Sequence, residues 1–175
     1  MKRKLFCLAL ALALALGLAA CGGKDDGGKT PGDAAQSQQP GQPAVSTYVF
    51  RSGESTVAID QDMAEVLAAL GEPKSYFEAE SCAFEGMDKT YTYSGFVITT
   101  RPDGDKDYVS SIVLTDDSVT TPEGLYIGSS ADNVAAAYGQ CDTQSDTLLG
   151  YAEGGTALNF ILDGGKVVSI EYLAE

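Results

Sequence analysis

Residues 127–139 read IGSSADNVAAAYG, a stretch in which apolar side chains recur at helical spacing between two glycines. These side chains fall at positions i, i+3, i+4 and i+7, which form one stripe of a helix. They belong to Ala131, Val134, Ala135 and Tyr138. Ser129 suits the N-cap, and Gly139 suits the left-handed position after the last turn. The stretch therefore predicts a helix of about three turns, although a glycine followed by serines also occurs in phosphate-binding loops.

A second stretch decides between these two interpretations. Residues 59–71 read IDQDMAEVLAALG, with the same length and the same spacing of apolar residues. Asp60 stands where an N-cap is expected, and Gly71 closes the stretch as Gly139 closes the other. A feature that occurs twice at one spacing is more simply the start and end of a helix than a phosphate site. The two stretches therefore indicate an internal repeat.

Short β-branched and aromatic runs, separated by glycine-containing turns, follow each predicted helix and indicate hairpins. The predicted strands are Lys89–Ser94, Phe96–Arg101 and Tyr108–Leu114, then Leu148–Ala152, Thr156–Leu162 and Lys166–Leu173. A leading strand at Val57–Ile59 or Leu125–Ile127 is a candidate addition to each set. The expected fold class is α+β, with two tandem repeats, each one helix followed by a three- to four-stranded antiparallel meander. The expected repeats are residues 47–117 and 118–175.

The N-terminus differs from the rest of the chain. Lys2, Arg3 and Lys4 precede a continuously apolar run that ends at residues 18–21, Leu-Ala-Ala-Cys. The first 20 residues therefore predict a secretion signal. The end of this run resembles the lipobox of bacterial lipoproteins, which implies a lipid on Cys21; the alternative is an ordinary signal cleaved near Ala20. Residues 21–46 are rich in Gly, Pro, Gln and Asp and predict a disordered tether.

Charge and composition exclude several classes of protein. The formal net charge is −14, and removal of the three basic signal residues makes it −17. Such a surface repels nucleic acid and anionic lipid headgroups. Membrane attachment is therefore expected through the lipid alone, on the extracytoplasmic face. The sequence contains no histidine, which removes the side chain best suited to proton transfer near neutral pH. We therefore expect no enzyme and no cofactor.

Two cysteines remain once Cys7 leaves with the signal and Cys21 is lipidated. They are Cys82 and Cys141. In an exported protein an even pair is a candidate disulfide, and the alternative is two separate thiols. Their isolated positions are not a metal-site pattern.

Residues 103–107, DGDKD, place three carboxylates at alternate positions, as the start of a calcium loop does. The stretch then departs from that pattern, because Tyr108 replaces the glycine of the sixth position and Leu114 the glutamate of the twelfth. An acidic hairpin tip is the expected reading. Asp103, Asp105 and Asp107 remain weak calcium candidates, and no other metal site is expected.

Tyrosines are frequent, and tryptophan is absent. Tyr91 and Tyr93 share one face of a predicted strand, because side chains alternate along a strand. With Tyr108 they are the candidate partner-binding residues, provided that they lie on the sheet face away from the helices. Aromatic side chains are enriched at protein interfaces.

The two helical stretches, followed by meanders in a small exported chain, resemble the superfamily of the β-lactamase-inhibitor protein and the BamE-like outer-membrane lipoproteins. Residues 82–100, CAFEGMDKTYTYSGFVITT, also look like those of uncharacterised lipoproteins of gut Firmicutes. The resemblance implies non-catalytic protein binding and assigns no inhibitory residue. We therefore expect a membrane-anchored protein-binding module of the cell envelope. The alternatives are a small-ligand or calcium-binding receptor, or a carboxylate-dependent hydrolase with a cleft between the repeats.

Overall fold

The computed structural model describes residues 48–175, which lie within one unit of the chain. The predicted signal peptide (1–20), the lipid site at Cys21 and the tether (21–46) lie outside the described residues. They stay predictions.

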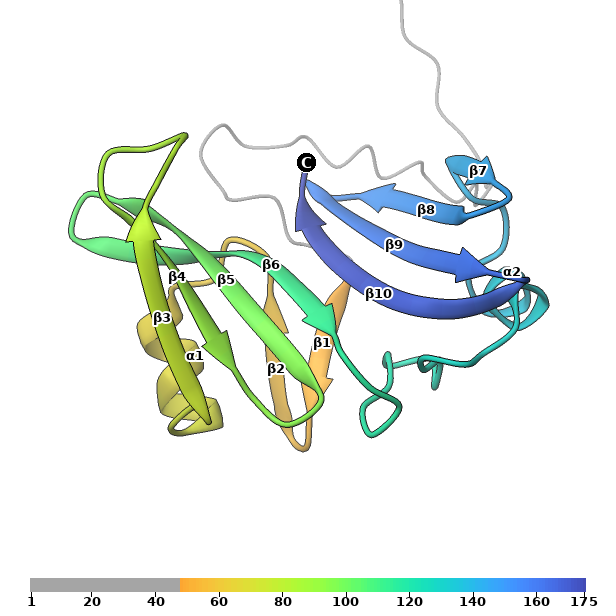
Figure 1. The fold of residues 1–175 in the computed structure, drawn as a ribbon, viewed down its shortest axis with the longest axis horizontal. Coiled ribbons are helices and arrows are strands. Elements are labelled where there is room, and N and C mark those ends of the chain that lie inside the picture. Colours follow the sequence, from red (N-terminus) through yellow and green to blue (C-terminus); the bar gives the residue numbers. More distant parts are fainter. Residues whose placement is uncertain (1–47) are drawn as a thin grey trace, which may run out of the picture. The chain divides into compact units, whose positions relative to one another are not determined.

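A single antiparallel sheet of eight strands dominates the structure (Figure 1). Its strand order is β3-β4-β5-β6-β10-β9-β8-β7, so the first half of the chain forms one side and the second half the other. The strands of the first side are β3 (Ser75–Glu80), β4 (Met87–Thr92), β5 (Phe96–Asp103) and β6 (Lys106–Leu114). Those of the second side are β7 (Thr143–Ser145), β8 (Leu148–Glu153), β9 (Thr156–Asp163) and β10 (Lys166–Ala174).

The centre of the sheet is the pairing of β6 with β10. Leu114 lies opposite Ile170, and Ile112 lies opposite Tyr172. All four side chains are buried, so the joint between the two sides is both hydrogen-bonded and packed.

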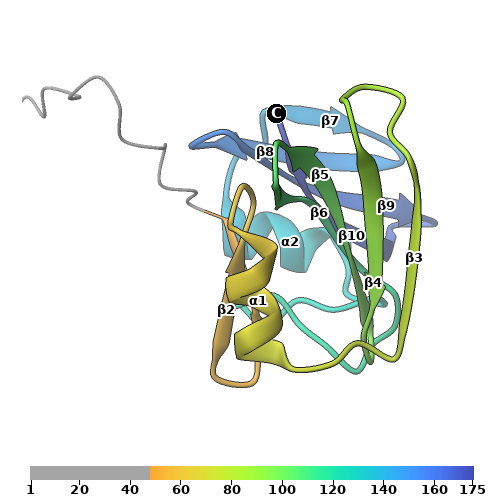
Figure 2. The ribbon, with the colours of Figure 1, turned by 90° about the vertical axis from the view of Figure 1, so that its left-hand side faces the viewer.

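One face of the sheet carries the other elements (Figure 2). They are α1 (Met63–Leu70), α2 (Ala131–Tyr138) and a hairpin formed by β1 (Val49–Ser52) and β2 (Ser55–Ala58). Phe50 of the hairpin packs against Phe96 and Tyr172, with ring centroids 4.7 and 6.2 Å apart. We call this the covered face of the sheet and the opposite one the open face.

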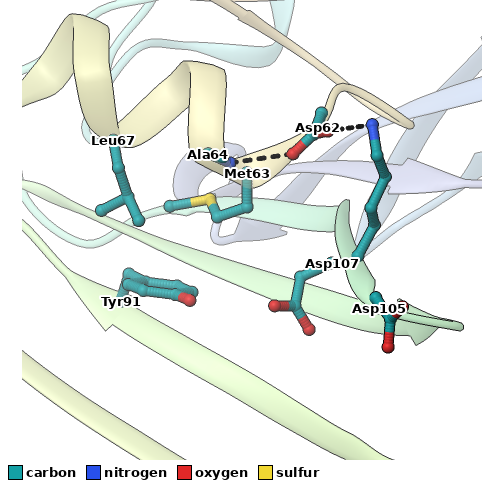
Figure 3. Close-up of a pocket in the computed structure, with 8 residues that line it drawn as sticks. Asp62, Met63, Ala64, Leu67, Tyr91, Asp105 and Asp107 are labelled. Carbon is teal, nitrogen blue, oxygen red and sulfur yellow. Dashed lines mark hydrogen bonds and ion pairs between the residues drawn. The ribbon is translucent and has the colours of Figure 1, made fainter.

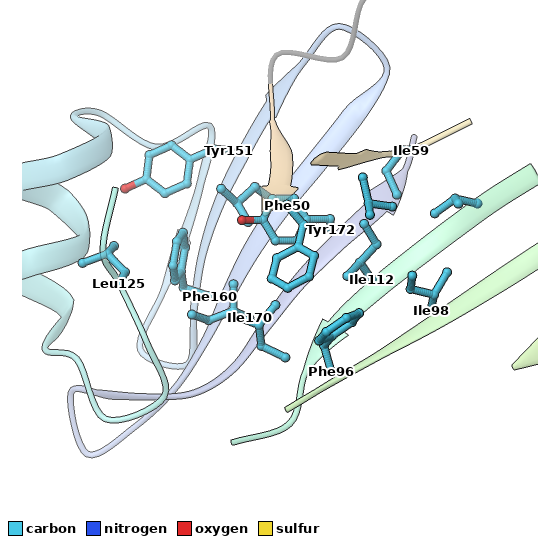
Figure 4. Close-up of a cluster of buried hydrophobic side chains, with 14 of the residues drawn as sticks. Phe50, Ile59, Phe96, Ile98, Ile112, Leu125, Tyr151, Phe160, Ile170 and Tyr172 are labelled. Atoms are coloured by element: carbon cyan, nitrogen blue, oxygen red, sulfur yellow. The ribbon is translucent and has the colours of Figure 1, made fainter. Parts of the chain in front are cut away.

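Alternation along the strands explains which side chains fill the core. Every second residue of β5 and of β9 is buried, as expected for strands with one covered face. The core side chains converge between the sheet, the hairpin and the helices (Figure 4). Each fully buried large apolar side chain contributes about 1.5–3 kcal/mol, so this shared core holds both halves of the sheet together.

Both predicted helices are confirmed, with shifted starts and shorter lengths. Each has eight residues, about two turns. Asp62 caps α1 by accepting a hydrogen bond from the Ala64 amide, and Ser130 caps α2 by accepting one from the Asn133 amide. The predicted caps, Asp60 and Ser129, lie outside the helices. The Ser129 hydroxyl instead accepts a hydrogen bond from the Tyr126 amide. Gly71 and Gly139 end the helices with φ of 78°, as predicted.

The predicted fold class is wrong. The structure is mostly antiparallel β-sheet, with two short helices, and is not a pair of tandem helix-plus-meander repeats. Its eight strands form one continuous sheet, because burying the apolar face of each half requires the other half and the shared hairpin. Residues 57 and 58 of one predicted leading strand belong to β2 of the separate β1–β2 hairpin, and residues 125–127 are not a strand. The predicted boundary at residues 117–118 falls in the connection between β6 and α2.

Candidate partner-binding site

Strand β3 forms one edge of the sheet. It pairs with β4 on one side, and no strand of residues 48–175 covers its other side. All six of its residues are exposed. An uncovered edge presents backbone N–H and C=O groups that can pair with another chain, so β3 offers a ready template for one more strand.

Three large apolar side chains are exposed on β3 and on the loop that follows it. The exposed fractions are 49% for Tyr76, 66% for Phe77 and 49% for Phe84. Tyr76 lies opposite Tyr91 and Phe77 opposite Thr90. Because neighbouring residues of a strand point to opposite faces, Tyr76 lies on the covered face and Phe77 on the open face. The edge is thus lined with aromatic surface on both faces.

Carboxylates accompany these aromatic residues on the covered face. Glu78 and Glu80 follow Tyr76 at every second position of β3, so they share its face of the sheet. The Tyr76 hydroxyl donates a hydrogen bond to the Glu78 carboxylate over 2.5 Å, and this bond is the main reason why the pKa of Tyr76 is raised. The edge therefore combines an unpaired backbone with negative charge on one face and an apolar residue, Phe77, on the other.

A pocket of about 250 Å³ opens on the covered face, next to this edge (Figure 3). It lies between the start of α1, strand β4 and the β5–β6 hairpin. Its lining residues are Asp62, Met63, Ala64, Leu67, Tyr91, Asp105, Lys106 and Asp107. Apolar side chains form its inner wall, and charged side chains of the hairpin form its outer wall.

Two ion pairs border the pocket. The Lys106 ammonium lies 2.7 Å from the Asp62 carboxylate, and the Lys89 ammonium lies 2.6 Å from that of Asp107. The bond from Lys106 is the main cause that lowers the pKa of Asp62, and the bond to Asp107 is the main cause that raises the pKa of Lys89. The pocket rim therefore already binds ammonium groups of the chain itself.

The structure places two of the predicted partner-binding tyrosines, Tyr91 and Tyr93, away from the open face. Tyr91 is 6% exposed and lies in the pocket beneath α1, where burial raises its pKa. Tyr93 stacks on Phe96 with ring centroids 5.0 Å apart and donates a hydrogen bond to the Gly71 carbonyl. Both side chains are therefore engaged in packing or hydrogen bonding within the fold itself.

Tyr108, the third of these tyrosines, lies opposite Arg101 on the open face, because its neighbour Asp107 lines the pocket on the covered face. The Arg101 guanidinium lies 5.4 Å from the Tyr108 ring centroid and 5.7 Å from that of Phe84. Arg101 also pairs with Asp60 at 3.0 Å. Cation–π contacts at partly exposed sites contribute roughly 0.5–1 kcal/mol each. Arg101 and Tyr108 thus hold Phe84 and its loop beside the edge strand.

The weak calcium candidates do not converge. Asp107 pairs with Lys89, and Asp103 lies 4.0 Å from Arg101. Within residues 48–175, no group of three or more His, Cys, Asp or Glu side chains is arranged to hold a metal ion.

Cys82 and Cys141 are both unbonded, so the candidate disulfide is not formed in this structure. Cys82 follows β3 and Cys141 precedes β7, which are the two opposite edges of the sheet. Seven strand spacings of about 4.8 Å separate these edges along the sheet, whereas a disulfide needs Cα atoms within about 7 Å. The alternative of two separate thiols agrees with the fold.

Sequence reasoning missed the edge strand, together with Tyr76, Phe77 and Phe84. The segment SYFEAE lacks the alternation of apolar and polar residues that marks a half-buried strand, because neither of its faces is buried. One usable signal was present: two adjacent aromatic residues follow Pro73, and Gly86 allows a turn before the next strand.

Neither helix in the described part of the chain has the length and apolar character needed to cross a bilayer. No family model matches the sequence, and no curated protein matches it. Among solved structures, the chain is similar to a DUF4309 family protein (YjgB) from Bacillus subtilis subsp. subtilis str. 168, a Firmicutes bacterium. The identity is 18%, over 66% of this chain and 79% of that one, with a TM-score of 0.40. A similarity this distant carries no argument about function, and the resemblance to BamE-like proteins finds no support.

Proposed function

We propose that this protein is a non-catalytic binding module that accepts an extended basic segment of a partner protein as a further strand beside β3. The observation that carries this proposal is the β3 edge itself, whose six residues are exposed and whose outer backbone no strand of residues 48–175 pairs with. Exposed aromatic side chains lie on both of its faces. Addition of a strand gains affinity from main-chain hydrogen bonds and specificity from the alternating side chains.

The side chains of β3 define the chemistry of that segment. On the covered face the added residues would meet Glu78 and Glu80, so basic residues fit there. On the open face they would meet Phe77, so apolar residues fit there. Each matched cross-strand pair contributes about 0.2–1 kcal/mol. The segment should therefore alternate between basic and apolar residues.

Charge disfavours a second copy of the chain at the same edge. Two β3 strands side by side would bring Glu78 and Glu80 of each copy close to those of the other, and like charges across strands are destabilising. The whole chain carries a net charge of −14, which also favours a basic partner through electrostatic steering. Attachment to a membrane through Cys21 stays a prediction from the sequence.

A capped heptapeptide of alternating valine and lysine tests the proposal by fluorescence anisotropy. We expect saturable binding that the double variant Glu78→Lys/Glu80→Lys weakens at least about tenfold, because two attractive pairs become repulsive. The matched control is Asp146→Lys/Asp163→Lys, which changes the net charge equally at exposed positions of the other half and should leave the affinity within about twofold.

N-methylation of the peptide separates strand addition from simple charge attraction. Methyl groups on the amides of one edge of the peptide should abolish binding, whereas methyl groups on the other edge should be tolerated, since one edge alone pairs with β3. The proposal would be overturned if the two N-methylated peptides bound equally well. It would also be overturned if the Glu78→Lys/Glu80→Lys variant bound the unmodified peptide as tightly as the parent protein does.

A further inference from the structure

We infer that the pocket at the start of α1 binds a lysine side chain of a partner protein. This site is distinct from the β3 edge, because it is lined by α1, β4 and the β5–β6 hairpin and by no residue of β3. It can therefore be occupied whether or not a strand is added beside β3.

The shape and lining of the pocket match the two parts of a lysine side chain. Met63, Leu67 and the buried Tyr91 ring form an apolar wall on one side (Figure 3). Asp105 and Asp107 face this wall from the hairpin. A volume of about 250 Å³ equals roughly eight water volumes, which is enough for four methylene groups and an ammonium. Lysine side chains place their methylene stem on apolar surface and their charge at its rim.

The charge balance leaves room for one more cation. The lining and its ion pairs contain three carboxylates, those of Asp62, Asp105 and Asp107, and two ammonium groups, those of Lys89 and Lys106. The remaining charge is one negative unit, so an anion is disfavoured and a single ammonium is matched. A divalent metal ion is disfavoured because the described residues gather no set of three ligands.

The chain supplies its own precedent for ammonium binding. Lys89 and Lys106 hold their ammonium groups 2.6 and 2.7 Å from carboxylates at the rim. The Lys106 side chain is 60% exposed, whereas its Asp62 partner is 19% exposed. Lys106 is thus a solvated cation on a partly buried acid, which makes it a competitor that an incoming lysine side chain displaces.

Methionine methyl NMR provides a direct readout, because the whole sequence contains three methionines. Met63 lines the pocket, and Met87 at the start of β4 does not. We expect titration with Nα-acetyl-lysine methylamide to shift the Met63 methyl signal saturably and to leave that of Met87 in place. The matched norleucine derivative lacks the charge and should not saturate.

Three variants test the proposed roles in the same titration. Asp105→Asn should weaken binding about fivefold, since a charge pair at 4 Å in a watery site is worth about 1 kcal/mol. Lys106→Gln should strengthen binding by a similar factor, because it frees Asp62 from its internal cation. Asp103→Asn lies on the same hairpin outside the lining and should change nothing. Equal shifts with norleucine, or weaker binding by Lys106→Gln, would overturn the inference.

Discussion

The two edges of the sheet differ sharply. β7 has three residues, Thr143–Ser145, all small or polar, whereas β3 has six and carries two exposed aromatic side chains. Proteins commonly protect sheet edges by making the edge strand short or charged. The β7 edge is protected by its length. The β3 edge is long and is protected by Glu78 and Glu80 alone, and those charges repel a second copy while admitting a basic segment.

Replacing one phenylalanine by alanine in each half of the sheet should give the largest difference, measured as the free energy of unfolding. Phe160 of β9 is fully buried, and Phe77 of β3 is 66% exposed. Phe160→Ala should lower the free energy of unfolding by about 3–5 kcal/mol. Phe77→Ala should change it by less than about 0.5 kcal/mol and should still weaken binding of the valine–lysine peptide. Urea denaturation measures both values, and similar losses of stability would contradict the assignment of β3 as a binding edge.

Removal of the protecting charges should have an intermediate effect. The variant Glu78→Val/Glu80→Val should self-associate at concentrations at which the parent chain is monomeric. A long uncharged edge strand can pair with the same edge of a second copy. Analytical ultracentrifugation measures this change. The matched variant Thr143→Val/Gln144→Val alters the short β7 edge and should stay monomeric. Self-association of both variants to the same degree would mean that edge length does not matter here.

The smallest expected effect is on how stability depends on pH, and it distinguishes the N-caps of the two helices. The pKa of Asp62 is lowered mainly by its bond to Lys106, whereas Ser130 does not titrate. A lowered pKa in the folded state means that the stabilising contribution is present above the unfolded-state value, 3.8, and is lost as the pH falls below it. The variant Asp62→Ser should therefore flatten the acid side of the stability profile by a small amount, as followed by urea denaturation from pH 5 to about 2.5. An unchanged profile would show that Asp62 is not coupled to folding.

Local signals in the sequence predict the helices and most strands. They do not predict which strands pair when those strands lie far apart in the chain. Gly71 and Gly139 end their helices as predicted, because a glycine with positive φ is a local requirement. The pairing of Leu114 with Ile170 joins residues far apart in the chain, and no local pattern distinguishes strands of one sheet from strands of two. The similar helical stretches therefore suggested separate repeats where the structure has one sheet.

The candidate site was harder to predict for a related reason. Tyr91 is a partner-binding candidate only if the strand face that it shares with Tyr93 lies away from the helices, and α1 covers that face. Tyr76 and Phe77 give no periodic signal, because an edge strand that is exposed on both faces does not need alternating apolar and polar residues. Asp105 and Asp107 were recognised as an acidic hairpin tip, but their position beside Met63 depends on how α1 packs against the sheet.

Among residues 48–175, the strand that comes last in the sequence, β10, lies in the middle of the sheet, and this order governs when the sheet can be completed. During synthesis, residues 111–114 of β6 have no strand partner on their far side until residues 166–174 leave the ribosome, so the two halves cannot be joined before then. Non-local pairing of this kind slows folding. A message cut short before Lys166 would yield a product in which β6 and β9 each lack their shared neighbour, and such unpaired apolar strands would direct it to aggregation or proteolysis rather than to partial function.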